Sequence, residues 1–116
     1  YIAFPIQDYA ENQLGYGVVR DYIGHGIGPT MHEDPDVPHY GVAGHGTRLK
    51  AGMTITIEPM INVGSWECSE PADDGWTIST VDGSLSCQYE HTIVITNDGP
   101  KILTSFDHDL DAKYLR

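Results

Sequence analysis

The 116-residue sequence is poor in cysteine and in basic residues, and both shortages exclude classes of protein. The two cysteines, Cys68 and Cys87, form no Cys-x-x-Cys pair, which excludes a zinc ribbon and a disulfide framework. Such sparse cysteine fits a reducing, cytoplasmic compartment. Only 6 Lys and Arg residues stand against 17 Asp and Glu residues, for a formal net charge of -11. Because phosphate backbones repel such a surface, the composition predicts no nucleic-acid partner.

The sequence also lacks a long apolar run. No stretch approaches the roughly 20 residues that a membrane-spanning helix requires. No signal-peptide pattern opens the chain. These absences predict a soluble protein with no membrane partner. The first residue is Tyr1 rather than Met, and it lies within a predicted helix, which suggests a segment of a longer protein.

The residue pattern predicts an α+β domain with one helix, antiparallel strands and two long loops. Apolar side chains at helical spacing predict the helix over residues 1–12. Strands are expected over 16–23 and 53–58, in a hairpin of 76–80 with 85–96 around Asp82-Gly83, and over 101–104. Loops are expected where glycine, proline and polar residues gather, over 24–46 and 62–75. The polar tail, 107–116, is expected to be peripheral.

Three short segments place metal-binding side chains at the ends of predicted strands. His25 lies between two glycines, Glu58 precedes Pro59, and Glu90 interrupts a run that otherwise looks buried. A buried carboxylate costs several kcal/mol or more unless it is paired or bound to a cation. Each segment alone also fits a structural explanation, such as a loop histidine or a strand with one solvated face.

Taken together, His25, Glu58 and Glu90 form a coherent set of ligands for a divalent metal. One imidazole with two carboxylates suits manganese, iron, cobalt or zinc. Such a metal lowers the pKa of a bound water, and Glu58 is placed to take the proton as general base. His32 is a candidate donor to the oxyanion that forms when this water attacks a carbonyl. His32 does not open a zincin helix, because the fourth residue after it is Asp36 rather than His.

Longer motifs carry a family resemblance. Residues 22–40 contain Gly-His-Gly around His25, the histidine His32 seven positions on, and the closing pair His39-Tyr40. Four further motifs follow in order: Thr56-Ile-Glu-Pro-Met60, Asp74-Gly-Trp-Thr77, Asp82-Gly-Ser-Leu-Ser86 and Gln88-Tyr-Glu-His-Thr92. From the opening helix to about Thr104, this succession resembles the type I methionine aminopeptidases. The short distance from His25 to Glu58 resembles type I rather than type II.

The resemblance implies a cytoplasmic metalloprotease that removes the initiator methionine from nascent polypeptides. It implies half of a pita-bread fold, with residues 1–116 as the C-terminal half of an M24-type catalytic domain. By motif, His25, Glu58 and Glu90 are ligands of two divalent ions, and Glu58 doubles as general base. His32 contacts substrate and steadies the tetrahedral intermediate. Met31 and Trp76 would wall the pocket for the methionine side chain.

The chain departs from the family pattern in lacking the other half of the fold. In the family, that half supplies two aspartate ligands and a further catalytic histidine, so the isolated chain is expected to turn over poorly. Its uncovered face is expected to associate with an N-terminal half or with a second copy. Two alternatives stay open: a non-catalytic half-domain that binds metal or a partner, and a prolidase-like relative. The remaining histidines, His39, His45, His91 and His108, are interpreted as structural or solvated.

Overall fold

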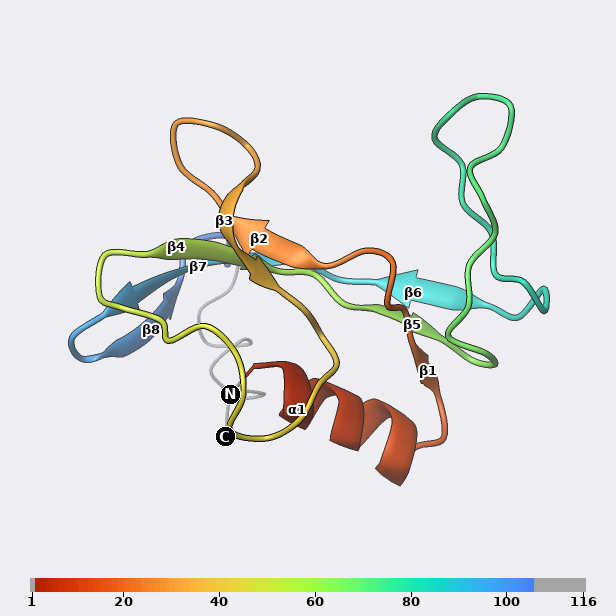
Figure 1. Ribbon diagram of the computed structural model, residues 1–116, viewed down its shortest axis with the longest axis horizontal. Helices are drawn as coiled ribbons and strands as arrows, with labels where there is room; N and C mark the ends of the chain where they lie inside the picture. The colour runs from red at the N-terminus through yellow and green to blue at the C-terminus, as the bar shows by residue number, and fades with distance from the viewer. Residues whose placement is uncertain (1, 106–116) are drawn as a thin grey trace.

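The computed structural model describes residues 2–105, which form one helix and eight strands in two sheets (Figure 1). All the strand pairings in this part of the chain are antiparallel, which confirms the predicted α+β class. No helix within residues 2–105 is long and apolar enough to cross a membrane. Tyr1 and the predicted peripheral tail, 107–116 with His108, lie outside the described residues.

The helix begins as α1 (Ala3–Gln7) and continues with wider π turns as η1 (Asp8–Gln13), close to the predicted range. Pro5 is tolerated because it lies in the first turn, where its absent N–H would have no helical acceptor. Gly15 closes the helix with a φ of 74°, a conformation that costs glycine little. Its N–H donates to the carbonyl of Glu11 at 3.1 Å.

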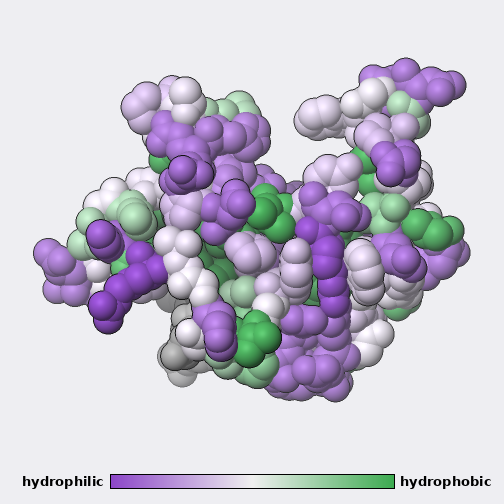
Figure 2. Space-filling view, viewed as in Figure 1, coloured by the Kyte–Doolittle hydropathy of each residue, from purple (hydrophilic) through white to green (hydrophobic). Residues whose placement is uncertain are grey.

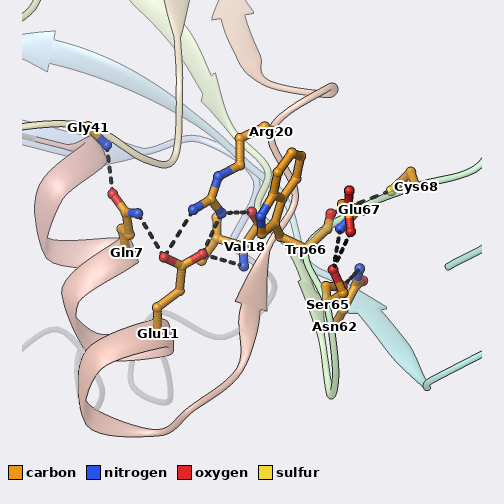
Figure 3. Close-up of polar contacts among 10 residues, drawn as sticks. All are labelled: Gln7, Glu11, Val18, Arg20, Gly41, Asn62, Ser65, Trp66, Glu67 and Cys68. Atoms are coloured by element: carbon orange, nitrogen blue, oxygen red, sulfur yellow. Dashed lines mark hydrogen bonds and ion pairs between the residues drawn. The ribbon is translucent and has the colours of Figure 1, made fainter. Parts of the chain in front are cut away.

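A partly buried ion pair between Glu11 and Arg20 attaches this helix to the rest of the domain (Figure 3). Glu11 accepts hydrogen bonds from the Arg20 guanidinium, the Val18 N–H and the Gln7 amide. The Arg20 guanidinium lies 4.8 Å from the ring centre of Trp66. Arg20, followed by the other hydrogen bonds, lowers the pKa of Glu11 to about 2. The helix is therefore joined to β1 and to the loop after β5 by charge-assisted contacts.

The larger sheet holds the residues of greatest chemical interest. Its strand order is β3-β2-β4-β7-β8, made of β3 (Glu33–Val37), β2 (Gly24–Gly26), β4 (Thr54–Ile57), β7 (His91–Thr96) and β8 (Gly99–Ile102). Central β4 pairs with β2 through Gly26 and Ile55. Glycine is required beside it, because a Cβ on Gly24 would lie 2.4 Å from the Thr56 carbonyl oxygen. This close approach brings His25 next to the end of β4.

The smaller sheet continues two strands of the larger one. Its order is β1-β5-β6, made of β1 (Gly17–Val18), β5 (Met60–Asn62) and β6 (Ser86–Gln88). Segment 54–62 runs from β4 into β5 with a break at Glu58-Pro59, and segment 86–96 runs from β6 into β7 with a break at Tyr89-Glu90 (Figure 1). The two breaks lie side by side, because the Tyr89 N–H donates to the Pro59 carbonyl at 3.4 Å.

One strand prediction and one loop prediction are wrong because pairing partners elsewhere in the chain decide where strands form. The strand expected over 16–23 is limited to Gly17–Val18, after which the chain bends and enters the other sheet as β2. The loop expected over 24–46 includes β2 and β3, which pair with each other. The loop over 62–75 is confirmed apart from Asn62, which ends β5, and an isolated bridge between Cys68 and Thr80.

The predicted hairpin of 76–80 with 85–96 is also wrong. Its turn exists, since the Gly83 N–H donates to the Thr80 carbonyl at 3.3 Å. The strand after that turn, β6, pairs with β5 instead, while β7 pairs with β4. The predicted strand 53–58 is confirmed as β4. The predicted return over 101–104 is confirmed as β8, which pairs with β7 across the turn at 97–98.

The buried core is small and partly polar. Its apolar members include Val18, Val19 and Ile55, all at most 2% exposed, and the polar residues His39, Thr56 and Asn62 are equally buried. On the face drawn in Figure 2, apolar residues form small separate groups among hydrophilic ones. Several large apolar side chains stay in solvent, including Leu85 at 80% exposure. The domain thus buries His39, Thr56 and Asn62 more completely than many of its large apolar side chains.

Candidate metal centre

His25 and Glu58 meet where β2 passes the end of β4. The His25 Nε2 lies 3.2 Å from the Glu58 Oε1, and the two side chains are 15% and 19% exposed. His25 is held between the glycines that allow β2 to approach its neighbours, and Glu58 stands at the break before Pro59. The structure therefore brings together two of the three predicted metal ligands, at a position that solvent still reaches.

The hydrogen bonding of His25 determines what this pair is suited to hold. Its Nδ1 lies 2.8 Å from the Gly26 carbonyl oxygen, which only accepts hydrogen bonds, so the network assigns a proton to Nδ1. In the neutral ring, Nε2 then presents its lone pair to a carboxylate oxygen. Two facing acceptors require a proton or a cation between them. One nitrogen and one oxygen donor suit a divalent transition metal, so the pair fits the predicted ion.

Two buried residues hold Glu58. The Thr56 hydroxyl donates to Glu58 Oε1 at 2.7 Å, and His39 Nε2 accepts the backbone N–H of Glu58 at 3.0 Å. Burial lowers the pKa of His39 to about 4, which keeps its ring neutral, as an accepting nitrogen requires. Among residues 2–105, the buried His39 Nδ1 has no hydrogen-bond partner. The interpretation of His39 as structural is confirmed, and its structural role is to hold the backbone of Glu58.

Glu90 lies opposite Glu58 in the backbone ladder. The register that pairs Ile57 with His91 continues without a shift to Met60 and Gln88, which leaves Glu58 facing Glu90 across the two breaks. Directly opposed residues in an antiparallel pair have Cβ atoms about 5 Å apart on one face. Nevertheless, within residues 2–105, no three His, Cys, Asp or Glu side chains converge on a point that would hold a metal ion. Glu90 is therefore in register with the pair without completing it.

The expectation that Glu90 interrupts a buried strand is wrong. Glu90 is exposed, and every residue of β7 is only half-buried. β7 has strands on both of its edges, β4 and β8, so the solvent reaches it through a face of the sheet. No other element of the described residues covers that face well enough to bury it.

His32 lies beside His25. The two ring centres are 4.2 Å apart with planes tilted by 49°, although His32 comes from the loop between β2 and β3. Both rings line an open hollow of about 440 Å³ next to Asp34 and Asp36. Glu33 also lines it, but its carboxylate accepts hydrogen bonds from the N–H and the hydroxyl of Thr30, which lower its pKa. The predicted substrate contact thus adjoins the predicted ligands.

Met31 and Trp76 are not brought together. They are 71% and 86% exposed, so neither packs against a neighbour. Met31 belongs to the loop between β2 and β3, and Trp76 to the long segment between β5 and β6. Figure 1 shows these two loops projecting from the same side of the molecule at separate positions. The described residues therefore form no enclosed pocket between the two side chains.

Sequence reasoning missed Thr56, although it lies inside one of the motifs that carry the family resemblance. Its hydroxyl is fully buried, and its only signal in the sequence is a polar residue on a strand of alternating apolar residues. Threonine is common in strands, so that signal does not distinguish a functional hydroxyl from a structural one.

Comparison with known proteins bears on the family to which the chain belongs. Residues 2–97 match the model of metallopeptidase family M24. Methionine aminopeptidase A of Synechocystis is 57% identical over 103 residues, covering 89% of this chain and 40% of the relative. Methionine aminopeptidase 1 of Bacillus subtilis is 52% identical, with 89% and 41% covered. The chain thus spans about 40% of the length of these relatives.

Solved structures show the same relationship. The methionine aminopeptidase of Rickettsia prowazekii superposes with a TM-score of 0.81 at 52% identity, covering 85% of this chain and 40% of that one. The Thermotoga maritima enzyme gives a TM-score of 0.82 at 50% identity, with 86% and 39% covered. These matches confirm the predicted fold, an α+β part of the pita-bread arrangement. On the family match and these likenesses, the chain belongs to metallopeptidase family M24.

Proposed function

We propose that this chain carries part of the metal centre of a methionine aminopeptidase, which removes N-terminal methionine from nascent polypeptides in the cytoplasm. The observation that carries the proposal is the 3.2 Å separation of His25 Nε2 and Glu58 Oε1. The proton that the Gly26 carbonyl requires on Nδ1 leaves the Nε2 lone pair of a neutral ring available for a cation. The relatives above, at 50–57% identity, are all named methionine aminopeptidases, which favours this activity over that of a prolidase. Residues 1–116 would form the C-terminal half of the catalytic domain.

The proposed ligands are His25, Glu58 and Glu90, for manganese, iron, cobalt or zinc. The 3.2 Å separation of His25 and Glu58 supports the first two, and the register of the ladder supports Glu90 as the third. A bound divalent ion would supply a water of lowered pKa and polarise the scissile carbonyl. Two ions are proposed for a complete enzyme, with further ligands from outside this chain.

Side chains of this chain would then supply the general base and a hydrogen-bond donor to the oxyanion. Glu58, whose carboxylate is oriented by Thr56, accepts the proton of the attacking water as general base. His32, whose ring lies beside that of His25, donates to the oxyanion of the tetrahedral intermediate. Met31 and Trp76 would contact the methionine side chain, because a flexible apolar group suits such neighbours. That role requires both exposed side chains to be covered by another part of an assembled enzyme.

We further propose that the exposed side of β6 and β7 is covered in the active form. β6 is exposed throughout, and Leu85, which directly precedes it, is 80% exposed. Exposed apolar residues of this size often mark an interface when they gather. The proposed occupant is the N-terminal half of such a catalytic domain, with a second copy of this chain as the alternative. Sedimentation of the chain alone distinguishes them, since a compact monomer at all concentrations contradicts self-association.

Methionine release from a Met-Ala-Ser peptide tests the proposed function. The chain is assayed with manganese or cobalt, alone and with a separately produced N-terminal half of a close relative, and EDTA serves as control. We expect turnover only with both halves, abolished by EDTA and by Glu58→Gln. Turnover by the chain alone would contradict the incomplete site. If no combination is active and yet this chain binds cobalt, the alternative of a non-catalytic metal-binding half-domain gains support.

A further inference from the structure

We propose that Thr56 is a positioning residue for the metal centre, and that its buried hydroxyl couples the two ligands His25 and Glu58. The proposal rests on the proposed function and adds a residue that contacts neither substrate nor metal. Thr56 would act by holding Glu58 Oε1 toward the imidazole of His25.

The position of Thr56 in β4 makes the contact with Glu58 possible. Side chains two residues apart along an extended chain point to the same face, so the hydroxyl reaches the carboxylate that follows it. The Thr56 Oγ1 donates to Glu58 Oε1 at 2.7 Å. This is the same oxygen that lies 3.2 Å from His25 Nε2. The hydroxyl therefore selects which carboxylate oxygen faces the imidazole.

The other ligand is attached to the same hydroxyl from 31 residues away. The backbone N–H of His25 donates to Thr56 Oγ1 at 3.0 Å. Since the hydroxyl proton is committed to Glu58, its lone pair is free to accept this N–H. Thr56 is only 1% exposed, so water is not available to replace the hydroxyl for either partner. Removing the hydroxyl would leave the His25 N–H unpaired and the Glu58 carboxylate free to rotate.

Close packing of the strands prevents other groups from taking over this role. A Cβ on Gly24 would lie 3.3 Å from Thr56 Oγ1 and 2.4 Å from the Thr56 carbonyl oxygen. β2 and β4 share one register pair, Gly26 with Ile55, so the hydroxyl supplies the next link between the strands. The contact therefore ties the spacing of the strands to the orientation of Glu58.

Three substitutions separate the hydroxyl from the rest of the side chain. Thr56→Val keeps the shape and branching at Cβ but removes the donor and acceptor. Thr56→Ser retains the hydroxyl. Thr54→Val is a matched control in the same strand, because the Thr54 hydroxyl makes no hydrogen bond within residues 2–105. If Thr56→Val does not fold by circular dichroism, Thr56→Ala takes its place with the same expectation.

Cobalt binding to the whole 116-residue chain, followed by visible absorption and calorimetry, is the main measurement. Loss of a hydrogen-bonding partner of a metal ligand typically weakens binding by 10–100-fold, so we expect at least about tenfold for Thr56→Val. Thr56→Ser should recover most of the affinity, and Thr54→Val should match the parent chain. Parent-like affinity in Thr56→Val, or no recovery in Thr56→Ser, would overturn the proposal.

A double-mutant cycle tests whether Thr56 acts through Glu58. In a Glu58→Ala background, which removes the acceptor of the Thr56 hydroxyl, adding Thr56→Val should change the residual cobalt affinity by less than about twofold. A full tenfold loss in that background would show a general structural effect and overturn the positioning role.

A measurement without metal keeps this proposal separate from the proposed function. If the parent chain binds no cobalt, the proposed metal centre fails for this chain. Hydrogen exchange at the His25 amide then decides the role of the hydroxyl. We expect exchange at least about tenfold faster in Thr56→Val, as for a lost hydrogen bond. The Ile27 amide, which donates to the Thr54 carbonyl at 3.0 Å, should be unchanged. Unchanged exchange at His25 would overturn the coupling.

Discussion

The two places where a strand passes from one sheet to the other differ in how they hold a carboxylate. At the first, Glu58 is bonded through its backbone to buried His39 and through its side chain to buried Thr56. At the second, Glu90 is exposed and makes no hydrogen bond within residues 2–105. Glu58 and Glu90 lie opposite each other in one continuous strand register. Strand register thus places the Glu90 carboxylate opposite Glu58. Only hydrogen bonding to buried neighbours gives a carboxylate a defined orientation, and Glu58 alone of the two has such neighbours.

The largest effect on activity should come from substitution of Glu58, the carboxylate held by Thr56 and His39. In the enzyme reconstituted from two halves, we expect Glu58→Gln to lower kcat by about 10²–10⁴-fold, because a general base contributes that much. Methionine release from a peptide measures it. The association of the halves, followed by sedimentation, should be unaffected. A loss below tenfold would remove Glu58 from the proposed role.

A third carboxylate, Glu11, shows what a fully paired acid contributes to stability. Its folded pKa of about 2 lies below the ordinary glutamate value of 4.5, so the unfolded chain binds the proton more readily. The resulting contribution to the free energy of unfolding is about 2 kcal/mol for such a pKa shift in a partly exposed group. It is complete above pH 4.5. It is lost as the pH falls toward 2. Urea unfolding of the chain and of Glu11→Gln should differ at pH 7 and converge at low pH. A difference independent of pH would contradict the pairing.

Metal binding to the chain alone tests whether Glu58 and Glu90 contribute differently to metal affinity. We expect Glu58→Gln to weaken cobalt binding about tenfold more than Glu90→Gln, since an oriented ligand loses less entropy on binding. Calorimetry with cobalt measures both variants. Equal losses would mean that Glu90 is already recruited by the metal, and that its exposure in the free chain has no bearing on affinity.

The smallest effect is expected at Trp76. In the isolated chain, Trp76→Ala should change the free energy of unfolding by no more than about 0.5 kcal/mol, because the side chain is 86% exposed. In the reconstituted enzyme, the same substitution should raise KM for a methionyl peptide if Trp76 enters the substrate pocket. Chemical denaturation and steady-state kinetics give the two values. A large loss of stability in the isolated chain would contradict the exposed position.

Local sequence features predicted the elements whose partners are near in the chain. The helix follows from apolar spacing with Pro5 in its first turn and Gly15 after its end. The β7–β8 hairpin follows from the turn at residues 97–98. The pairing of β6 with β5 was not predicted, because the local turn at Gly83 favoured a hairpin that more distant partners displaced. The short strands β1 and β2 were misjudged for the same reason.

By itself, the sequence determined which groups are proposed for the site, an imidazole and two carboxylates, and the order of the motifs that resemble the type I aminopeptidases. These properties lie in residue types and spacing, which need no coordinates. Only the tertiary structure decided that the Thr56 hydroxyl lies between the His25 N–H and the Glu58 carboxylate. It also decided that Glu58 is held while Glu90 is exposed. The physical reason is that hydrogen bonding across 31 residues, and burial of each partner, depend on how the strands pair and pack.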